Sequence, residues 1–147
     1  MPTGVRNDPY RSFNFRIEID GVTLASFSEV TGLATEGDAV PYREGADKVN
    51  LSRQLVGQRK VGPITMKLGI TKNLELWNWY AAIAAGQPLR RNGTIVLQDE
   101  AHNDVLRFEF SNGWINKFEG PHLTASGNEV AIESVEIVHE GLQIALA

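Results

Sequence analysis

The stretch Phe13–Val22 reads FNFRIEIDGV and carries the clearest structural signal in the sequence. Its first seven residues place an apolar side chain at every second position, which is typical of a β-strand with one buried face. Asp-Gly follows at 20–21, and a second run continues with Leu24 and Phe27. Because both central residues of a tight turn must accept positive φ angles, Asp-Gly predicts a hairpin between these two runs.

Period-two alternation recurs along the rest of the chain, and we expect a strand wherever it does. The segments are 64–70, 94–97, 106–110 and 114–118. Asn92-Gly93 predicts a turn, and Asn112-Gly113 predicts a turn or a bulge. Val130 and Ile132 lie in the opposite phase from Val135 and Ile137. This change predicts a bulge at Ser134, or a strand that leaves one sheet and enters another.

One helix is predicted, over about Leu74 to Ala85. Thr71 or Asn73 can cap its start, and Gly86 with Pro88 should end it. Four apolar side chains recur at the spacing i, i+3, i+4 and i+7 and therefore share one face. We interpret this face as packing against the core: Leu76, Trp79, Tyr80 and Ile83.

Residues 36–62 form a polar, glycine-containing segment between these regular elements. A structureless loop of that length is unusual inside a compact domain. Val40 with Tyr42 and Val49 with Leu51 have the spacing of two extended arms. We therefore predict a protruding β-hairpin, with a mobile loop as the alternative.

The composition excludes several classes of function. The chain has 147 residues, no cysteine and a formal net charge of −4, so we expect one domain over 1–147, without disulfides or thiolate chemistry. A modestly acidic balance argues against general nucleic-acid binding through a basic surface. The start of the chain has no apolar signal-like segment, so we expect cytoplasmic synthesis without a signal peptide and no stable membrane insertion by the monomer.

The predicted fold is mainly β, a sandwich or barrel with one flanking helix and the protruding hairpin. Open sheet edges present unpaired N–H and C=O groups, and natural monomers protect such edges with proline or lysine. Few of these devices occur in the predicted strands. Two explanations stay open: the sheets continue into neighbouring copies of the chain, or a closed barrel removes the edges.

No pattern of reactive residues accompanies this fold. The three histidines, His102, His122 and His139, lack the spacing of metal ligands on a helix, and we interpret His139 as a solvated or hydrogen-bonded strand residue. The adjacent acids Asp99 and Glu100 should point to opposite faces of a strand and not share a substrate. The glycine-rich phosphate motifs and the nucleophile elbow are absent from the sequence. We therefore expect no enzyme, no cofactor and no metal site.

Several pieces of the sequence, in order, resemble one known family. DPYRSFNFRIEIDGV at 8–22 and FSEVTGL at 27–33 look like the opening of the tail tube proteins of contractile phages and their relatives, which include R-type pyocins and extracellular contractile injection systems. Further matching pieces follow in the same order: YREG at 42–45, RKVG at 59–62, ELWNWY at 75–80, NGWINKFEGP at 112–121, GNEVAIE at 127–133 and HEGL at 139–142.

The resemblance implies a subunit of six-membered rings that stack into a hollow tube inside a contractile sheath. Sheath contraction would drive the tube through a target envelope, with DNA or protein effectors as lumen cargo. The implied partners are other copies of the chain, the sheath protein, and baseplate and tube-terminating proteins. The ring protein of type VI secretion shares the implied fold. The alternatives are a tube-initiating or baseplate-proximal paralogue of the same machine, or a small-ligand β-barrel.

The resemblance also assigns candidate contact surfaces. Segment 36–62 would reach the adjacent ring, where charged side chains set register and partner choice more than affinity. The inter-ring candidates are Tyr42, Arg43, Glu44, Asp47, Lys48, Arg53, Arg59 and Lys60. Two polar faces are candidates to line the lumen: Asn14, Arg16 and Glu18, or Glu133 and Glu136.

Overall fold

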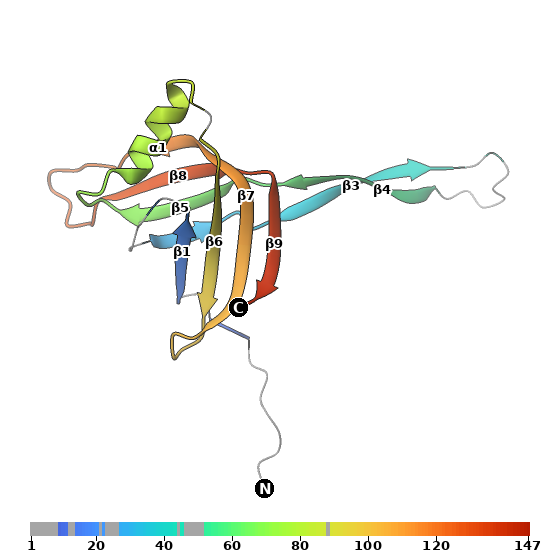
Figure 1. Ribbon diagram of the computed structural model, residues 1–147, viewed down its shortest axis with the longest axis horizontal. Coiled ribbons are helices and arrows are strands. Elements are labelled where there is room, and N and C mark those ends of the chain that lie inside the picture. Colours follow the sequence, from blue (N-terminus) through green and yellow to red (C-terminus); the bar gives the residue numbers. More distant parts are fainter. Residues whose placement is uncertain are drawn as a thin grey trace, which may run out of the picture.

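The computed structural model describes residues 9–11, 14–20, 22, 27–43, 45, 52–87 and 89–147. This part of the chain is mainly β with one helix, as predicted (Figure 1). The elements in chain order are β1 (Phe15–Ile19), β2 (Phe27–Thr31), β3 (Thr35–Tyr42), β4 (Arg53–Val61), β5 (Ile64–Gly69), α1 (Glu75–Ala84), β6 (Arg91–Gln98), β7 (Asp104–Glu119), β8 (Ile132–Val138) and β9 (Gly141–Leu146).

Two four-stranded antiparallel layers share the long strand β7. The first half of β7 pairs with β6 on one side and β9 on the other, and β1 continues that layer beyond β6. The second half of β7 pairs with β8, followed by β5 and β2. The layers form an open sandwich and do not close into a barrel.

β7 changes layers at a bulge, as the Asn112-Gly113 pair predicted. Ser111 and Asn112 together stand opposite Asn92 of β6, so β7 carries one extra residue there. Asn112 has a φ of 51°, and its backbone N–H donates to Oδ1 of Asn92. The bulge bends the strand, because the extra residue is left out of the regular ladder.

Two sequence predictions about bulges and turns are wrong. The pairing of β8 with β5 is regular through Ser134, and the second irregularity lies on β7 between Ile115 and Lys117. The phase change arises because Val130 precedes β8 and Ile132 lies on its outer face. Asn92-Gly93 lies inside β6 and not in a turn. Glycine is required there because a Cβ at Gly93 would collide with the ring of Phe110.

The prediction of a hairpin at Asp20-Gly21 is also wrong, because the two strands that flank the turn do not pair with each other. β1 pairs with β6, and β2 pairs with β5 in the other layer. The only described ladder contact across the turn is the bridge between Ile19 and Val22. Residues 23–26, including Leu24, lie outside the described residues.

The hydrophobic core lies between the two layers, and α1 closes one end of it. Leu76 and Trp79 of the predicted helical face are buried, and Tyr80 and Ile83 pack against the core. Trp79 Nε1 donates a hydrogen bond of 2.7 Å to the carbonyl of Leu89. Further core side chains come from both layers: Ile17, Ile19, Ile64, Met66, Leu68, Ile95, Phe110, Ile115, Val135 and Ile137.

The ends of α1 match their sequence signals closely. Oδ1 of Asn73 accepts the backbone N–H of Glu75 at 2.9 Å, next to the N-cap position at Leu74. At the other end Gly86 takes a φ of +95°. The N–H groups of Gly86 and Gln87 bond the carbonyls of Ile83 and Ala82, which is the bonding pattern of a Schellman cap.

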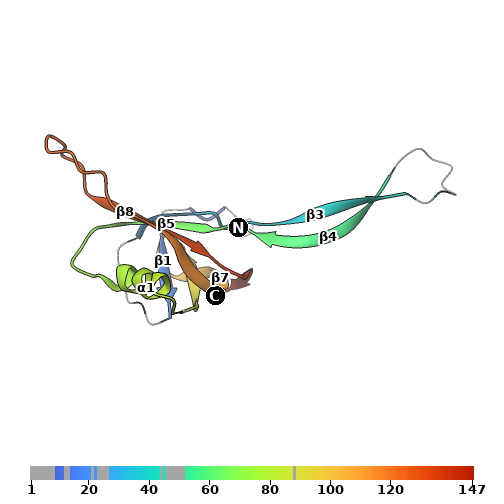
Figure 2. The same cartoon turned by 90° about the horizontal axis from the view of Figure 1, so that it is seen from above.

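β3 and β4 form the predicted hairpin, which projects far from the sandwich (Figures 1 and 2). The hairpin prolongs the β2–β5 pair, because β2 leads into β3 and β4 leads into β5. The connection between β7 and β8 projects at the opposite end of the molecule (Figure 2). Gly32 lies where the ribbon leaves the sandwich, with a φ of +88°, and a Cβ there would collide with the carbonyl oxygen of Pro63.

We predict that Gly32→Ala destabilises the fold by about 1–3 kcal/mol, since the side chain adds both a collision and an unfavourable backbone conformation. Thermal unfolding followed by circular dichroism measures the effect. Gly120→Ala is the matched control, because a Cβ at Gly120 meets no atom within 4 Å. Equal unfolding temperatures for the two variants would contradict this account of Gly32.

Candidate assembly surfaces

The β3–β4 hairpin has almost no contact with the core. Every residue of β3 is exposed, and so are all residues of β4 except two. Val56 is 82% exposed, and the cross-strand pair Val40 and Leu55 is about half exposed. An isolated two-stranded hairpin is only marginally stable in water. The exposed apolar side chains therefore indicate a surface that another molecule covers.

The structure spreads the predicted inter-ring residues along this hairpin. Tyr42 and Arg53 face each other at its outer end, with Arg43 next to them. Arg59 and Lys60 lie near its base, where Lys60 Nζ forms an ion pair of 3.1 Å with Asp38. Three further candidates lie outside the described residues: Glu44, Asp47 and Lys48.

β9 carries a second uncovered apolar surface, which the sequence analysis missed. Leu142, Ile144 and Leu146 stand opposite Phe110, Phe108 and Leu106 of β7, on the core side of the sheet. Ile144 and Leu146 are nevertheless 63% and 83% exposed. Within the described residues, β9 pairs with β7 alone. One strand edge and one apolar strip are thus left available.

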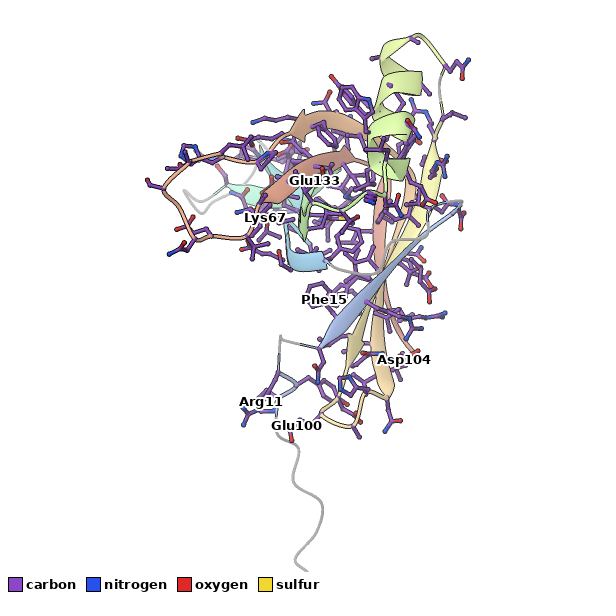
Figure 3. The ribbon with its side chains drawn as sticks, turned by 90° about the vertical axis from the view of Figure 1, so that its left-hand side faces the viewer. Arg11, Phe15, Lys67, Glu100, Asp104 and Glu133 are labelled. Atoms are coloured by element: carbon purple, nitrogen blue, oxygen red, sulfur yellow. The ribbon has the colours of Figure 1, made fainter. Side chains whose placement is uncertain are left out.

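The outer face of the β1–β6–β7–β9 layer is polar and contains the first set of lumen candidates. Arg16 Nη2 donates to Oδ2 of Asp104 at 2.7 Å, and Arg16 Nε donates to Glu18 Oε1 at 2.9 Å. Asp104 lies at the start of β7 (Figure 3). Hydrogen bonds from Arg16 and then Gln98 lower the pKa of Asp104, and the bonds to Asp104 and Glu18 raise that of Arg16.

Two neighbouring contacts complete this polar face. Asn14 Nδ2 donates to the carbonyl of Asp99 at 3.1 Å. Arg107 and Glu109 of β7 form an ion pair of 3.5 Å. Asn14, Arg16 and Glu18 alternate along one face of the chain, so the structure brings this first set together.

The second set of lumen candidates is divided. Glu133 lies in phase with the buried residues Val135 and Ile137, whereas Glu136 lies on the opposite face of β8. Glu133 stands beside Leu68 of β5, and burial raises the pKa of its carboxyl group. These two residues cannot line one wall together.

The acids and two of the histidines considered in the sequence either have local partners or are exposed. Asp99 accepts the backbone N–H groups of Ala101 and Asn103, and these bonds, chiefly with Asn103, lower its pKa. Glu100 instead pairs with Arg11 at 3.1 Å (Figure 3), so the adjacent acids have separate partners. His102 and His122 are exposed. Among the described residues, no cluster of three His, Cys, Asp or Glu side chains could hold a metal ion.

His139 is the residue whose role the sequence underestimated. It is only 5% exposed, and its two ring nitrogens lie 3.0 Å from the carbonyl oxygen of Gly141 and 2.9 Å from that of Gly62. Gly62 lies between β4 and β5, at the base of the hairpin. The alternating pattern of β8 could have indicated the burial, since His139 continues the phase of Val135 and Ile137, but not the two partners.

The described part of the chain contains no helix that is long and apolar enough to cross a bilayer.

In architecture the molecule is an open β-sandwich with a projecting hairpin, like chains from contractile injection systems. A chain from the cryo-EM structure of the PVC sheath-tube complex in its extended state has a TM-score of 0.85 at 21% identity, over 96% of this chain and 94% of that one. A chain from the anti-feeding prophage cap has a TM-score of 0.87 at 22% identity, over 99% and 97%. Hcp1 from Flavobacterium johnsoniae is more distant, with a TM-score of 0.55 at 14% identity, over 88% and 93%.

The family is shown by a match over residues 11–143 to the model of the T4-like virus tail tube protein gp19. The chain belongs to this family, which confirms the resemblance seen in the sequence, and it is a structural tube subunit. A comparison with curated proteins gave no match.

The position of Glu133 gives a pH-dependent prediction. Burial raises the pKa of this carboxyl group, so the folded protein favours its protonated, neutral form. The stability that this preference contributes is fully present below the ordinary carboxyl pKa of about 4.3 and is lost as the pH rises through the folded value. We expect Glu133→Gln to stabilise the protein at pH 7 by about 0.5 kcal/mol or less, because the group stays partly solvated. The gain should vanish near pH 3.5.

Thermal unfolding at the two pH values measures this difference, with Glu136→Gln on the opposite face of β8 as the control. A Glu133→Gln variant that is less stable than the unmodified protein at pH 7 would refute the burial argument.

Proposed function

We propose that the chain forms six-membered rings that stack into the inner tube of a contractile tail or injection particle. Membership of the tail tube family supports this, together with the fold shared with chains of contractile injection systems. The observation that carries the proposal is the exposed apolar hairpin on a sandwich in which β9, among the described residues, pairs with β7 alone. Both features leave surface that copies of the chain would cover.

The lateral contact follows from strand order. β1 and β9 end the same four-stranded layer and, after three antiparallel steps, run in opposite directions. Rotation about the ring axis does not change which way a strand runs along that axis. β9 of one copy therefore meets β1 of the next copy in antiparallel orientation. Six copies joined in this way close one barrel and leave its layer without free edges. The neighbouring copy would also cover Ile144 and Leu146.

The hairpin provides the contact between rings. β3 and β4 run well beyond the sandwich (Figure 2). The described part of the subunit leaves Val40, Leu55 and Val56 exposed, and a copy in the adjacent ring would cover them. The charged candidates on the same hairpin set the register of that contact, since exposed pairs contribute only about 0–1 kcal/mol each. Repetition around each ring multiplies weak contacts into a stable stack.

The polar face with Arg16, Glu18 and Asp104 becomes the lumen wall in this arrangement. Its named charged side chains are two positive, Arg16 and Arg107, and three negative, and they pair with each other. The wall is therefore mixed and slightly acidic, and it would not retain the phosphates of DNA. Such a wall suits passage of DNA or protein effectors without adhesion. The outer surface of the tube is left for the sheath, and the tube ends for baseplate and terminating proteins. The role is structural and requires no catalysis.

Electron microscopy of the unmodified purified protein tests the proposed function. We expect six-fold rings and tubes of stacked rings, because the uncovered surfaces of one copy are complemented by the next. Monodisperse monomers at high concentration would exclude the proposal. Rings that never elongate would instead favour a tube-initiating role.

We predict that Val56→Asp abolishes stacking and leaves the subunit folded. Val56 is 82% exposed and contributes little to the isolated subunit, so unfolding stability should change by no more than about 0.5 kcal/mol. A charge at a buried inter-ring contact is strongly unfavourable. Tube yield by sedimentation, with thermal unfolding alongside, measures both effects.

The control is Val130→Asp, which changes a valine of similar exposure, 76%, just before β8 and far from the hairpin. Tubes of normal yield from Val56→Asp would contradict the role of the hairpin.

A further inference from the structure

The register of β3 and β4 decides which side chains of the hairpin share a face. Opposite residues of an antiparallel pair point to the same face, and successive residues of a strand alternate. Val40 pairs with Leu55 and therefore shares one face with Tyr42, two residues further along β3. Ala39 pairs with Val56, so Val56 lies on the opposite face from Val40. The exposed apolar side chains of the hairpin thus belong to two faces and not to one.

Both faces are uncovered in the subunit. On the first face Val40, Leu55 and Tyr42 are each close to half exposed, and on the second Val56 is almost fully exposed. A hairpin that rests on one surface keeps its other face polar, which gives an alternating sequence pattern. The continuous run from Ala39 to Tyr42 is instead typical of a strand that is covered on both sides.

The charged side chains of β3 and β4 are distributed unevenly along the hairpin. Most of them lie at its base: Glu36, Asp38, Arg59 and Lys60. The outer half of the hairpin, residues 39–42 and 53–56, contains Arg53 as its one charged side chain. Burying a charge is costly, whereas burying apolar side chains is favourable. The base is therefore suited to water, and the outer half is suited to burial.

The edges of the hairpin are poorly suited to pair with a further strand. Pro41 has no N–H group and removes one donor from β3. On β4, Gly57 and Gln58 together stand opposite Asp38, and this bulge interrupts the ladder next to the outer half. Prolines and bulges are devices that protect sheet edges from other chains. Another molecule would therefore cover the outer half through its faces.

We propose that each hairpin is inserted between two copies of the chain in the adjacent ring, one against each face of its outer half. The inference rests on the proposed function and names the place that receives the hairpin. A single flat surface covers one face, whereas the seam between two neighbouring subunits offers two walls. A closed ring has as many seams as subunits, so every hairpin of one ring has an equivalent seam in the next.

Thiol labelling of single-cysteine variants tests whether both faces are covered. The chain contains no cysteine, so Val40→Cys and Val56→Cys each place one thiol, on opposite faces of the hairpin. Each variant is assembled as a minor component with an excess of unmodified protein. We expect maleimide to label both thiols about tenfold or more slowly in tubes than in free subunits, because a covered thiol reacts only when the contact opens.

Val130→Cys is the matched control, since Val130 is 76% exposed and precedes β8, away from the hairpin. It reports whether the reagent reaches the tubes. Slow labelling at one face with unchanged labelling at the other would overturn the inference, because the hairpin would then lie flat on one surface. That result would leave the tube role intact, whereas an absence of tubes from the unmodified protein would refute the proposed function and the inference together.

A cryo-EM reconstruction of unmodified tubes identifies the chains on each face, and it decides the question if a cysteine variant is not incorporated. We expect two different copies of the adjacent ring, one beside Val40 and Leu55 and the other beside Val56. A single copy against both faces, or solvent against one of them, would overturn the inference.

Discussion

The fold depends on one strand that belongs to two sheets. β7 pairs with β9 up to Ser111 and with β6 up to Gly113, and it pairs with β8 from Trp114 onward. The bulge at Asn112 redirects the strand, so that the apolar faces of both layers meet across one core. Each fully buried aliphatic or aromatic side chain in that core contributes about 1.5–3 kcal/mol. Without the bend, the two layers would have separate faces and no common interior.

The same geometry explains why the hairpin can project. β2 and β5 are fixed in the second layer, and their continuation beyond Gly32 and Gly62 leaves the sandwich as β3 and β4. Gly32 makes the close passage past Pro63 possible, and His139 connects Gly62 to the start of β9. The hairpin is anchored at its base by the core and left exposed over its length. A long exposed arm on a rigid body is well suited to contact another copy.

Local patterns predicted the elements but not all of their partners. The alternation of Phe15, Ile17 and Ile19 fixes which side chains of β1 face the core, and the Gly86 signal fixes the end of α1. Asp20-Gly21, by contrast, predicted a pairing that the fold replaces with β1–β6 and β2–β5. Among the candidate surface residues, Arg16 and Glu18 share a face as expected, while Glu133 and Glu136 are separated by the pleat of β8.

The sequence by itself determined the mainly β class, the single helix, the hairpin over 36–62 and the tail tube family. Each of these features depends on residues that are close together in the sequence or on an ordered series of short motifs. Only the tertiary structure decided that β7 is shared, that Gly93 lies under Phe110, that Ile144 and Leu146 are uncovered, and that His139 meets two carbonyls. Backbone hydrogen bonds are alike for every strand, so the choice between possible partners depends on how the whole chain packs.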